Sequence, residues 1–414
     1  MRSRPFVALY ISVFVATMGI SMVSPLLPVF AEELGATGVW LGLTFSVFAI
    51  VQTFVGPFAG RLSDRFGRKP FIIAGLLVYL VAALGYLTAG SFYQVIAFRA
   101  FSGLGTSLIF SVARAHVGDL TPRGQEGRWL GVFATADVVG FGTGPLVAGV
   151  LRELLGFRSV FAAMALMMGL SALILLMWLP RHSPAELERR AIRRAGGTVT
   201  SENSSFRSAL TERVVLAVTL HAGLIAIAVG ATLSFLALRL EQGIGATPIM
   251  IGVAFATQDI TGGLAQPLFG RVADRRDRRL LVAGGLLLYA ALLASLGVVP
   301  TYALAVGVLL GMGASTSLAM VAAGAIQVVA GRRAGMGTVL GISSAANGIG
   351  IVAGSLVSGL IVDAYGLAAA FMFGGGVIAA GVPLFLWLTR GAAVAEPVAP
   401  GRGPLAKEAV DGAR

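Results

Sequence analysis

Long apolar segments recur along the chain and are separated by short polar segments. A helix that crosses a membrane needs about 20 consecutive, mostly apolar residues. Twelve segments meet that description, six on each side of a polar stretch near the middle of the chain. The predicted spans are 6–30, 39–60, 71–89, 92–117, 129–151 and 158–180, then 213–238, 248–270, 280–298, 301–329, 337–361 and 366–389. The pattern predicts an all-α integral membrane protein with twelve transmembrane helices.

The polar segments divide the chain into four parts. Residues 1–180 and 213–390 are predicted to form an N-terminal and a C-terminal six-helix bundle. Residues 181–212 contain a cluster of arginines and a run of small polar residues, which is typical of a solvated linker on the cytoplasmic side. Residues 391–414 are rich in proline, glycine and alanine, and their composition predicts a disordered cytoplasmic tail.

The two predicted bundles repeat one sequence pattern at a shift of 210 residues. Residues 56–65 reappear as 266–275, and several glycines in later spans recur at the same shift. Because each half contains six spans, both halves have the same orientation in the membrane. The sequence therefore predicts two parallel repeats around a central cavity.

Basic residues indicate how the spans are oriented. Of the 31 lysines and arginines, all but four fall on the side that holds both chain ends; the exceptions are Arg99, Arg152, Arg158 and Arg239. Lysine and arginine concentrate on the cytoplasmic side of membrane proteins. We therefore expect a multi-pass protein of the cell (inner) membrane with both termini in the cytoplasm.

Composition narrows the function. The chain is 57% hydrophobic and 12% charged, whereas soluble domains are about 25% charged. The net charge of +12 lies in short clusters between apolar spans, which argues against nucleic acid as a partner. The chain has no cysteine, which excludes disulfides and thiolate metal sites. No phosphate-binding loop and no catalytic constellation occurs in the sequence, so we expect no metal, no cofactor and no enzyme activity.

A charged motif is predicted to fill a very short cytoplasmic loop between the second and third spans. Its residues are Gly60, Asp64, Arg65, Gly67 and Arg68, and its second copy contains Gly270, Asp274 and Arg275. This motif resembles the loop signature of the major facilitator superfamily. In that family an acid at the end of the fourth span, here Asp119, locks the loop; Asp119 is placed to pair with Arg65 or Arg68, or it is a solvated helix-end charge.

The fifth span carries a second pattern, formed by Gly131, Gly140, Gly144, Pro145 and Gly149. Glycines four residues apart let helices touch backbone to backbone, and proline bends a helix. The pattern is similar to the signature of the twelve-helix drug:proton antiporter branch of the same family. That resemblance implies proton-coupled exchange. Several relatives place an acid in the first span, where this chain has none, and this weakens an assignment to cationic drugs.

Ionisable residues within predicted spans are costly and usually functional. Asp137, Asp259, Arg99 and His221 are of this kind, and the two aspartates are candidates for proton coupling. Asp137 has a second interpretation as the structural partner of Arg99, and His221 as a packing residue. Gln52, Gln258, Gln327 and Asn347 are polar cavity candidates, although interhelical hydrogen bonding is their more common role.

We expect a secondary transporter that exports small molecules or drugs in exchange for protons by alternating access. Its partners would be the substrate, protons and the lipid bilayer, and we expect a monomer. A carrier of sugars, lipids or metabolites on the same fold is the alternative. A membrane sensor that no longer transports is a third interpretation, disfavoured by two intact copies of the loop motif.

Overall fold

The computed structural model describes residues 4–121, 125–180 and 211–390. In these residues the regular elements are helices. The first half contains α1 (Arg4–Val23), α2 (Leu27–Glu33), α3 (Gly38–Phe66), α4 (Arg68–Thr88), α5 (Phe92–Leu120), α6 (Glu126–Leu155) and α7 (Phe157–Trp178). The second contains α10 (Arg213–Ile244), α11 (Pro248–Ala273), α12 (Arg278–Leu296), α13 (Tyr302–Ala334), α14 (Met336–Tyr365) and α15 (Leu367–Leu388). The predicted tail and all but the last two residues of the predicted linker lie outside the described residues.

The described helices are long and apolar enough to span a membrane. Eleven segments qualify by length and hydropathy, with α1 and α2 counted as one. The twelfth long helix, α11, has 26 residues but contains no stretch as apolar as those of the other eleven segments. The all-α, twelve-span fold class predicted from the sequence is confirmed.

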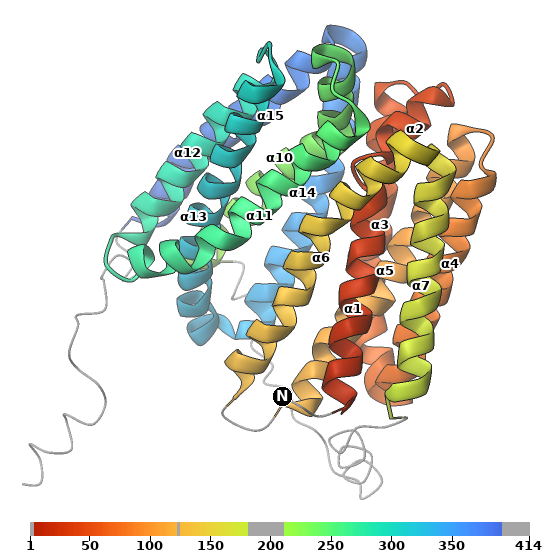
Figure 1. The fold of residues 1–414 in the computed structure, drawn as a ribbon. Coiled ribbons are helices and arrows are strands. Elements are labelled where there is room, and N and C mark those ends of the chain that lie inside the picture. The colour runs from red at the N-terminus through yellow and green to blue at the C-terminus, as the bar shows by residue number, and fades with distance from the viewer. Residues whose placement is uncertain (1–3, 122–124, 181–210, 391–414) are drawn as a thin grey trace, which may run out of the picture.

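The two halves have the same internal packing. In the first half α1 packs on α6 and α7, while α3 and α4 pack on α5. In the second half α10 packs on α14 and α15, while α11 and α12 pack on α13. Figure 1 shows the halves side by side, the first in red to yellow and the second in green to blue. This correspondence confirms two parallel six-helix repeats.

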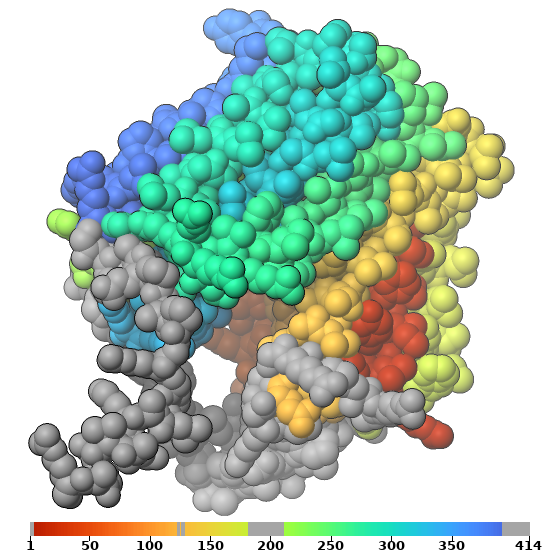
Figure 2. Space-filling model, turned by 60° about the vertical axis from the view of Figure 1, so that its left-hand side comes forward, coloured from red at the N-terminus to blue at the C-terminus, as the bar shows by residue number. Residues whose placement is uncertain are grey.

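The halves meet at one end of the molecule and diverge at the other. They join along two helix pairs, α3 with α14 and α6 with α11. An added Cβ at Gly42 would collide with the carbonyl of Ser355, and one at Gly252 with the carbonyl of Pro145. We call this the closed end. Toward the N-terminus the helices spread apart (Figure 1), and Figure 2 shows a hollow between the halves there, which we call the open end.

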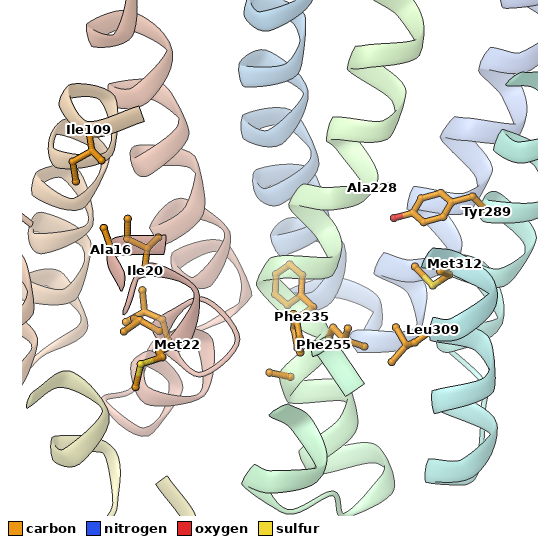
Figure 3. Packing of buried hydrophobic residues seen from close by; sticks show 14 of the residues in the cluster. Ala16, Ile20, Met22, Ile109, Ala228, Phe235, Phe255, Tyr289, Leu309 and Met312 are labelled. Carbon is orange, nitrogen blue, oxygen red and sulfur yellow. The ribbon is translucent and has the colours of Figure 1, made fainter. Parts of the chain in front are cut away.

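Buried apolar side chains form the core in both halves of the molecule. Figure 3 shows Ala16, Ile20 and Met22 of α1 with Ile109 of α5 in the first half. In the second half it shows Phe235 of α10 with Phe255 of α11. All of these side chains are buried. These contacts pack the helices within each half closely against one another.

The first span differs from the single helix predicted for residues 6–30. It is broken at residues 24–26, after which α2 begins. Pro25 lies in the break and Pro28 in the first turn of α2. Proline has no N–H to donate, so the pair interrupts the hydrogen bonding of a continuous helix and redirects the chain.

The predicted loop between the second and third spans is also different. Helix α3 continues to Phe66 and α4 begins at Arg68, so most of the charged motif is helical. The connection is the single residue Gly67, whose φ of 108° and ψ of 152° favour glycine. Gly60 lies inside α3, and an added Cβ there would meet nothing within 4 Å.

Candidate functional site

A cavity of about 240 Å³ lies between the two halves, where α6 faces α11 and α13. It is lined by Asp137, Val138 and Phe141 of α6, by Gln258, Asp259, Gly262, Gly263 and Gln266 of α11, and by Gly313, Thr316, Ser317 and Met320 of α13. The wall is largely apolar with a few polar groups, the usual character of a small-molecule site. Each half contributes one carboxylate to it.

Both carboxylate oxygens of Asp137 have partners in the first half. The hydroxyl of Thr17 on α1 donates to Oδ1 at 3.3 Å, and Nη2 of Arg114 on α5 lies 3.6 Å from Oδ2. The Asp137 side chain is 15% exposed and that of Arg114 is 67% exposed. An ion pair with one well-exposed member is weak. The pair can therefore separate if a ligand or a conformational change offers a better partner.

Asp259 has no hydrogen bond or ion pair among the described residues, and its side chain is exposed to the cavity. Two neighbouring polar atoms, Oε1 of Gln258 and Oγ of Ser317, are buried without a hydrogen-bond partner. A polar group left unsatisfied in a buried position is costly. These groups are free to bind a ligand that enters between α11 and α13.

Arg99 makes no ion pair with its predicted alternative partner, Asp137. Its guanidinium carbon lies 4.7 Å from the ring centroid of Phe45 and 4.5 Å from that of Phe48. The side chain is buried, and its Nε and Nη1 have no hydrogen-bond partner. Arg114, not Arg99, contacts Asp137.

The other predicted cavity residues lie outside the cavity lining. His221 on α10 is buried, and its Nε2 has no hydrogen-bond partner. The backbone carbonyl of Gln52 accepts a hydrogen bond from Ser107 at 3.3 Å, and the side chain is partly buried. Gln327 is partly buried and Asn347 is exposed. The structure thus brings together Asp137, Gln258 and Asp259 but none of these four.

The glycines of the predicted fifth span pack against two different helices. An added Cβ at Gly140 would lie 3.1 Å from the carbonyl of Phe14, and one at Gly144 would lie 2.6 Å from that of Met18, both on α1. An added Cβ at Gly149 would lie 2.5 Å from the carbonyl of Pro248, at the start of α11. Only close approach of helices explains these contacts. Gly131 has open space around it.

The first copy of the charged motif is held together within its own half. Arg68 bonds Asp64 at 2.5 Å, Asp119 at 3.1 Å and the hydroxyl of Ser63 at 2.8 Å. The expected partner of Asp119 is therefore Arg68, while Arg65 lies over the ring of Phe66. The guanidinium ties α3, α4 and α5 together at the open end.

The second copy is built differently. Asp274 follows directly after α11, Gly270 lies in the last turn of that helix, and Arg275 is the next residue. Asp277 accepts hydrogen bonds from the backbone and side chain of Arg279. Partial burial raises the pKa of Asp277, but these hydrogen bonds and the charge of Arg279 outweigh it and leave the pKa below its usual value.

The 210-residue repeat is also seen in the contacts that attach the last helix of each half at the open end. Nζ of Lys69 donates to the carbonyl of Leu179 at 2.5 Å, and Nη1 of Arg279 donates to the carbonyl of Thr389 at 3.1 Å. Both members of the second pair lie 210 residues after those of the first. A basic residue after each motif thus secures the last helix of its half.

Sequence reasoning missed part of the cavity. Arg114 lies inside the predicted span 92–117 but was counted with the basic residues of the cytoplasmic side, and so it was not considered as a partner of Asp137. Nothing in the sequence around Thr17 identifies it as a hydrogen-bond partner of Asp137. Thr316 and Ser317 did carry a signal, because three consecutive hydroxyl side chains interrupt an apolar helix there.

Two parallel six-helix repeats around a cavity lined by polar groups from both halves define a membrane transporter. The sequence model of the Major Facilitator Superfamily matches residues 9–247 and 218–410. The chain belongs to the Major Facilitator Superfamily. This confirms the family indicated by the charged motif.

Known proteins that resemble the chain are transporters as well. An uncharacterized MFS-type transporter of Methanocaldococcus jannaschii is 26% identical over 381 residues, covering 88% of this chain and 93% of that protein. The multidrug resistance protein MdtG of Proteus mirabilis is 25% identical over 375 residues, covering 88% of this chain and 90% of MdtG. The crystal structure of the nucleoside transporter NupG has a TM-score of 0.77 at 13% identity, covering 94% of this chain and all of NupG.

Proposed function

We propose that the protein is a proton-coupled exporter that exchanges small molecules or drugs for protons by alternating access. The observation that carries this proposal is that Asp137 and Asp259, one from each half, line a single cavity. A site between two bodies that rock against each other is reached from one side at a time. Carboxylates in such a site are costly unless they have a function.

The two carboxylates have different roles in this proposal. Asp137 is held by Thr17 and Arg114, so its charge is partly balanced within its own half. Asp259 has no such partner among the described residues, so a proton or a substrate group is what balances its charge. Competition between the two at Asp259 couples proton entry to substrate release. Gln258 and the hydroxyls of α13 supply polar contacts to the substrate.

The relatives support export. One curated relative aligned over most of the chain is named a multidrug resistance protein. The glycine and proline pattern of α6, which resembles that of drug:proton antiporters, packs α6 between α1 and α11. The helix that carries Asp137 therefore touches both halves, and a change at Asp137 reaches the interface directly.

The proposal also includes the orientation of the protein in the membrane and the roles of its linker and charged motifs. The concentration of basic residues at the open end supports a cytoplasmic location for that end, and in this orientation the structure would be the inward-facing state. The protein would lie in the cell (inner) membrane as a monomer, with residues 181–212 as a cytoplasmic linker between the bundles. The motif around Asp64, Arg68 and Asp119, with its second copy around Asp274, would form the cytoplasmic gate.

The decisive test is proton-driven transport by purified protein in proteoliposomes with an imposed pH gradient. Asp259→Asn and Asp137→Asn should each reduce proton-driven flux about tenfold or more, a barrier increase of about 1.4 kcal/mol. Substrate binding or exchange without a gradient should survive, because the cavity is intact. A cationic dye, a neutral antibiotic and a sugar serve as test substrates.

Glu212→Gln is the matched control, since this carboxylate lies at the start of α10 and outside the cavity lining. Full proton-driven flux in both aspartate variants would contradict the proposal. Sugar flux that ignores the pH gradient would favour a metabolite carrier, and binding without any flux would favour a sensor.

A further inference from the structure

Two carboxylates at the closed end each cap a helix that belongs to the other half. Asp363, near the end of α14, accepts hydrogen bonds from the backbone N–H groups of Gly38 at 2.7 Å and Val39 at 2.9 Å. Glu153, near the end of α6, accepts one from the N–H of Ile249 at 3.0 Å. Gly38 and Val39 begin α3, and Ile249 is the second residue of α11.

The two caps are equivalent contacts, one formed by each half of the repeat. The 210-residue shift carries Glu153 onto Asp363 and Val39 onto Ile249. An interface in which each body gives and receives the same contact is isologous, as in a symmetric dimer. The counterpart of Gly38 is Pro248, which has no N–H to donate. This explains why one cap has two hydrogen bonds and the other has one.

The capped helices depend on the opposite half. The first N–H groups of a helix have no partner within it, and a carboxylate there is favoured by hydrogen bonding and by the helix dipole. Thr37, the residue before α3, makes no side-chain cap, and Thr247 before α11 makes a long one at 3.4 Å. When the halves separate at this end, both helices lose their caps.

Two further pairs cross the closed end. Arg152 of α6 makes two hydrogen bonds, of 3.0 and 2.7 Å, with the carboxylate of Glu241 on α10. The amide of Gln242 donates to Glu32 at 2.5 Å, and these two residues are themselves 210 apart. Residues related by the repeat can touch only near its two-fold axis. The caps therefore flank the axis on opposite sides.

We propose that the reciprocal caps of Asp363 and Glu153 are a latch that keeps the closed end shut and sets the balance between the two states of the transporter. The proposal rests on the alternating-access function proposed above. Because the latch consists of two equivalent contacts on either side of the axis, the end opens only when both break. Each cap should favour the closed end about fivefold, and the two together about 25-fold.

Distances between spin labels test this directly in lipid nanodiscs. The chain has no native cysteine, so Leu155→Cys with Val298→Cys places one exposed label in each half at the closed end. Phe58→Cys with Leu268→Cys does the same toward the open end. Combining Asp363→Ala with Glu153→Ala should raise the long-distance population at the closed end about 25-fold and shorten the open-end distance. Each single variant should have a smaller effect.

Gln94→Ala is the control, because Gln94 accepts a hydrogen bond from the backbone N–H of Gly90 within its own half at the closed end and should leave the closed-end distances unchanged. Unchanged distances in the folded double variant would overturn the latch. If the alanine variants do not fold, Asp363→Asn with Glu153→Gln keeps the side-chain volume and should shift the same distances less. No shift in that pair would also overturn it. The distances do not depend on transport, so failure of the proposed function is recognised separately by the absence of flux.

Discussion

Arg99 shows how the fold accommodates a single charge inside the membrane. Its guanidinium lies between the rings of Phe45 and Phe48, and in the described part of the chain no carboxylate is within ion-pair distance. Contact with ring faces compensates a buried cation in part. The remaining cost is not offset by hydrogen bonds at Nε and Nη1. A charge buried in the membrane with these atoms unsatisfied indicates that Arg99 has a function other than stabilising the fold.

Replacing Arg99 should therefore separate stability from activity. Arg99→Met should leave the free energy of unfolding unchanged or raise it by about 1–4 kcal/mol, because an apolar side chain of similar length replaces a buried charge that has no carboxylate partner. Transport should fall. Thermal unfolding in detergent and flux in proteoliposomes measure the two effects.

Arg239→Met is the comparison. Arg239 donates hydrogen bonds to the carbonyls of Leu296 and Val299, so its loss should lower stability by about 1–3 kcal/mol. A larger loss from Arg99→Met than from Arg239→Met would show that the aromatic contacts of Arg99 hold the fold.

At the scale of residues, the sequence predicted which charged side chains lie in the membrane but not which residues they contact. Asp137 and Asp259 are recognisable as carboxylates inside apolar spans. Whether Asp137 contacts Arg99 or Arg114 depends on how α5 packs beside α6 in three dimensions. Both arginines lie on α5, 15 residues apart. The hydrophobic pattern alone does not distinguish the two arginines, because apolar residues surround α5 without leaving a clearly polar face.

At the scale of elements, the crossings of α3 with α14 and of α6 with α11 depend on glycine. Gly42 and Gly252 are related by the repeat, and each faces a backbone carbonyl of the opposite half. Small residues at such crossings are what drives helices together where lipid removes the hydrophobic effect. The closed end is therefore built on backbone contact, which tolerates no side chain.

Gly42→Ala should push α3 away from α14. We expect a loss of about 1–3 kcal/mol in the free energy of unfolding, the usual cost of overpacking. Gly252→Ala should have a similar effect by symmetry. Gly60→Ala, on the same helix as Gly42 but in open space, should change stability little or raise it slightly. Equal effects at Gly42 and Gly60 in thermal unfolding would contradict this account.

The elements themselves were largely predictable. The length of the apolar segments located every span, and the 210-residue repeat located the matching span in the other half. The exceptions have local causes. Pro25 and Pro28 break the first span, and Gly67 alone makes the turn that a loop was expected to make. A strongly charged stretch such as residues 61–66 looks like a loop in hydropathy, but nothing in it prevents helix formation, and α3 continues through it.

At the scale of the whole molecule, the contacts of the closed end predict those of the other state. Along the antiparallel pair, Gly42 faces Ser355, and farther along Thr53 faces Gly348. Continuing that register toward the open end places Leu62 opposite Leu340. Both are exposed in the present state. Rocking of the halves that opens one end should bring these two leucines together.

A cross-link tests that register. In the naturally cysteine-free chain, Leu62→Cys with Leu340→Cys should form a disulfide only when the open end shuts, since the bond requires Cα atoms within about 7 Å. Adding the alanine variants of both caps should increase the yield. The reaction is followed by a mobility shift on a gel.

Leu62→Cys with Leu360→Cys provides the comparison, because Leu360 lies at the far end of α14 and should not cross-link. Equal yields from the two pairs would show that the cysteines react through disorder and not through rocking.

Helix α11 carries the polar side of the cavity, and this has a consequence for biosynthesis. Gln258, Asp259 and Gln266 lie on the one long helix that falls short of the others in hydropathy. An aspartate at the centre of a span costs about 2.5–3.5 kcal/mol during insertion. Such a segment partitions poorly into lipid when it leaves the ribosome alone. We expect its entry into the bilayer to depend on packing with α10 or α12, so the binding chemistry of the finished protein would constrain the order in which its second half is assembled.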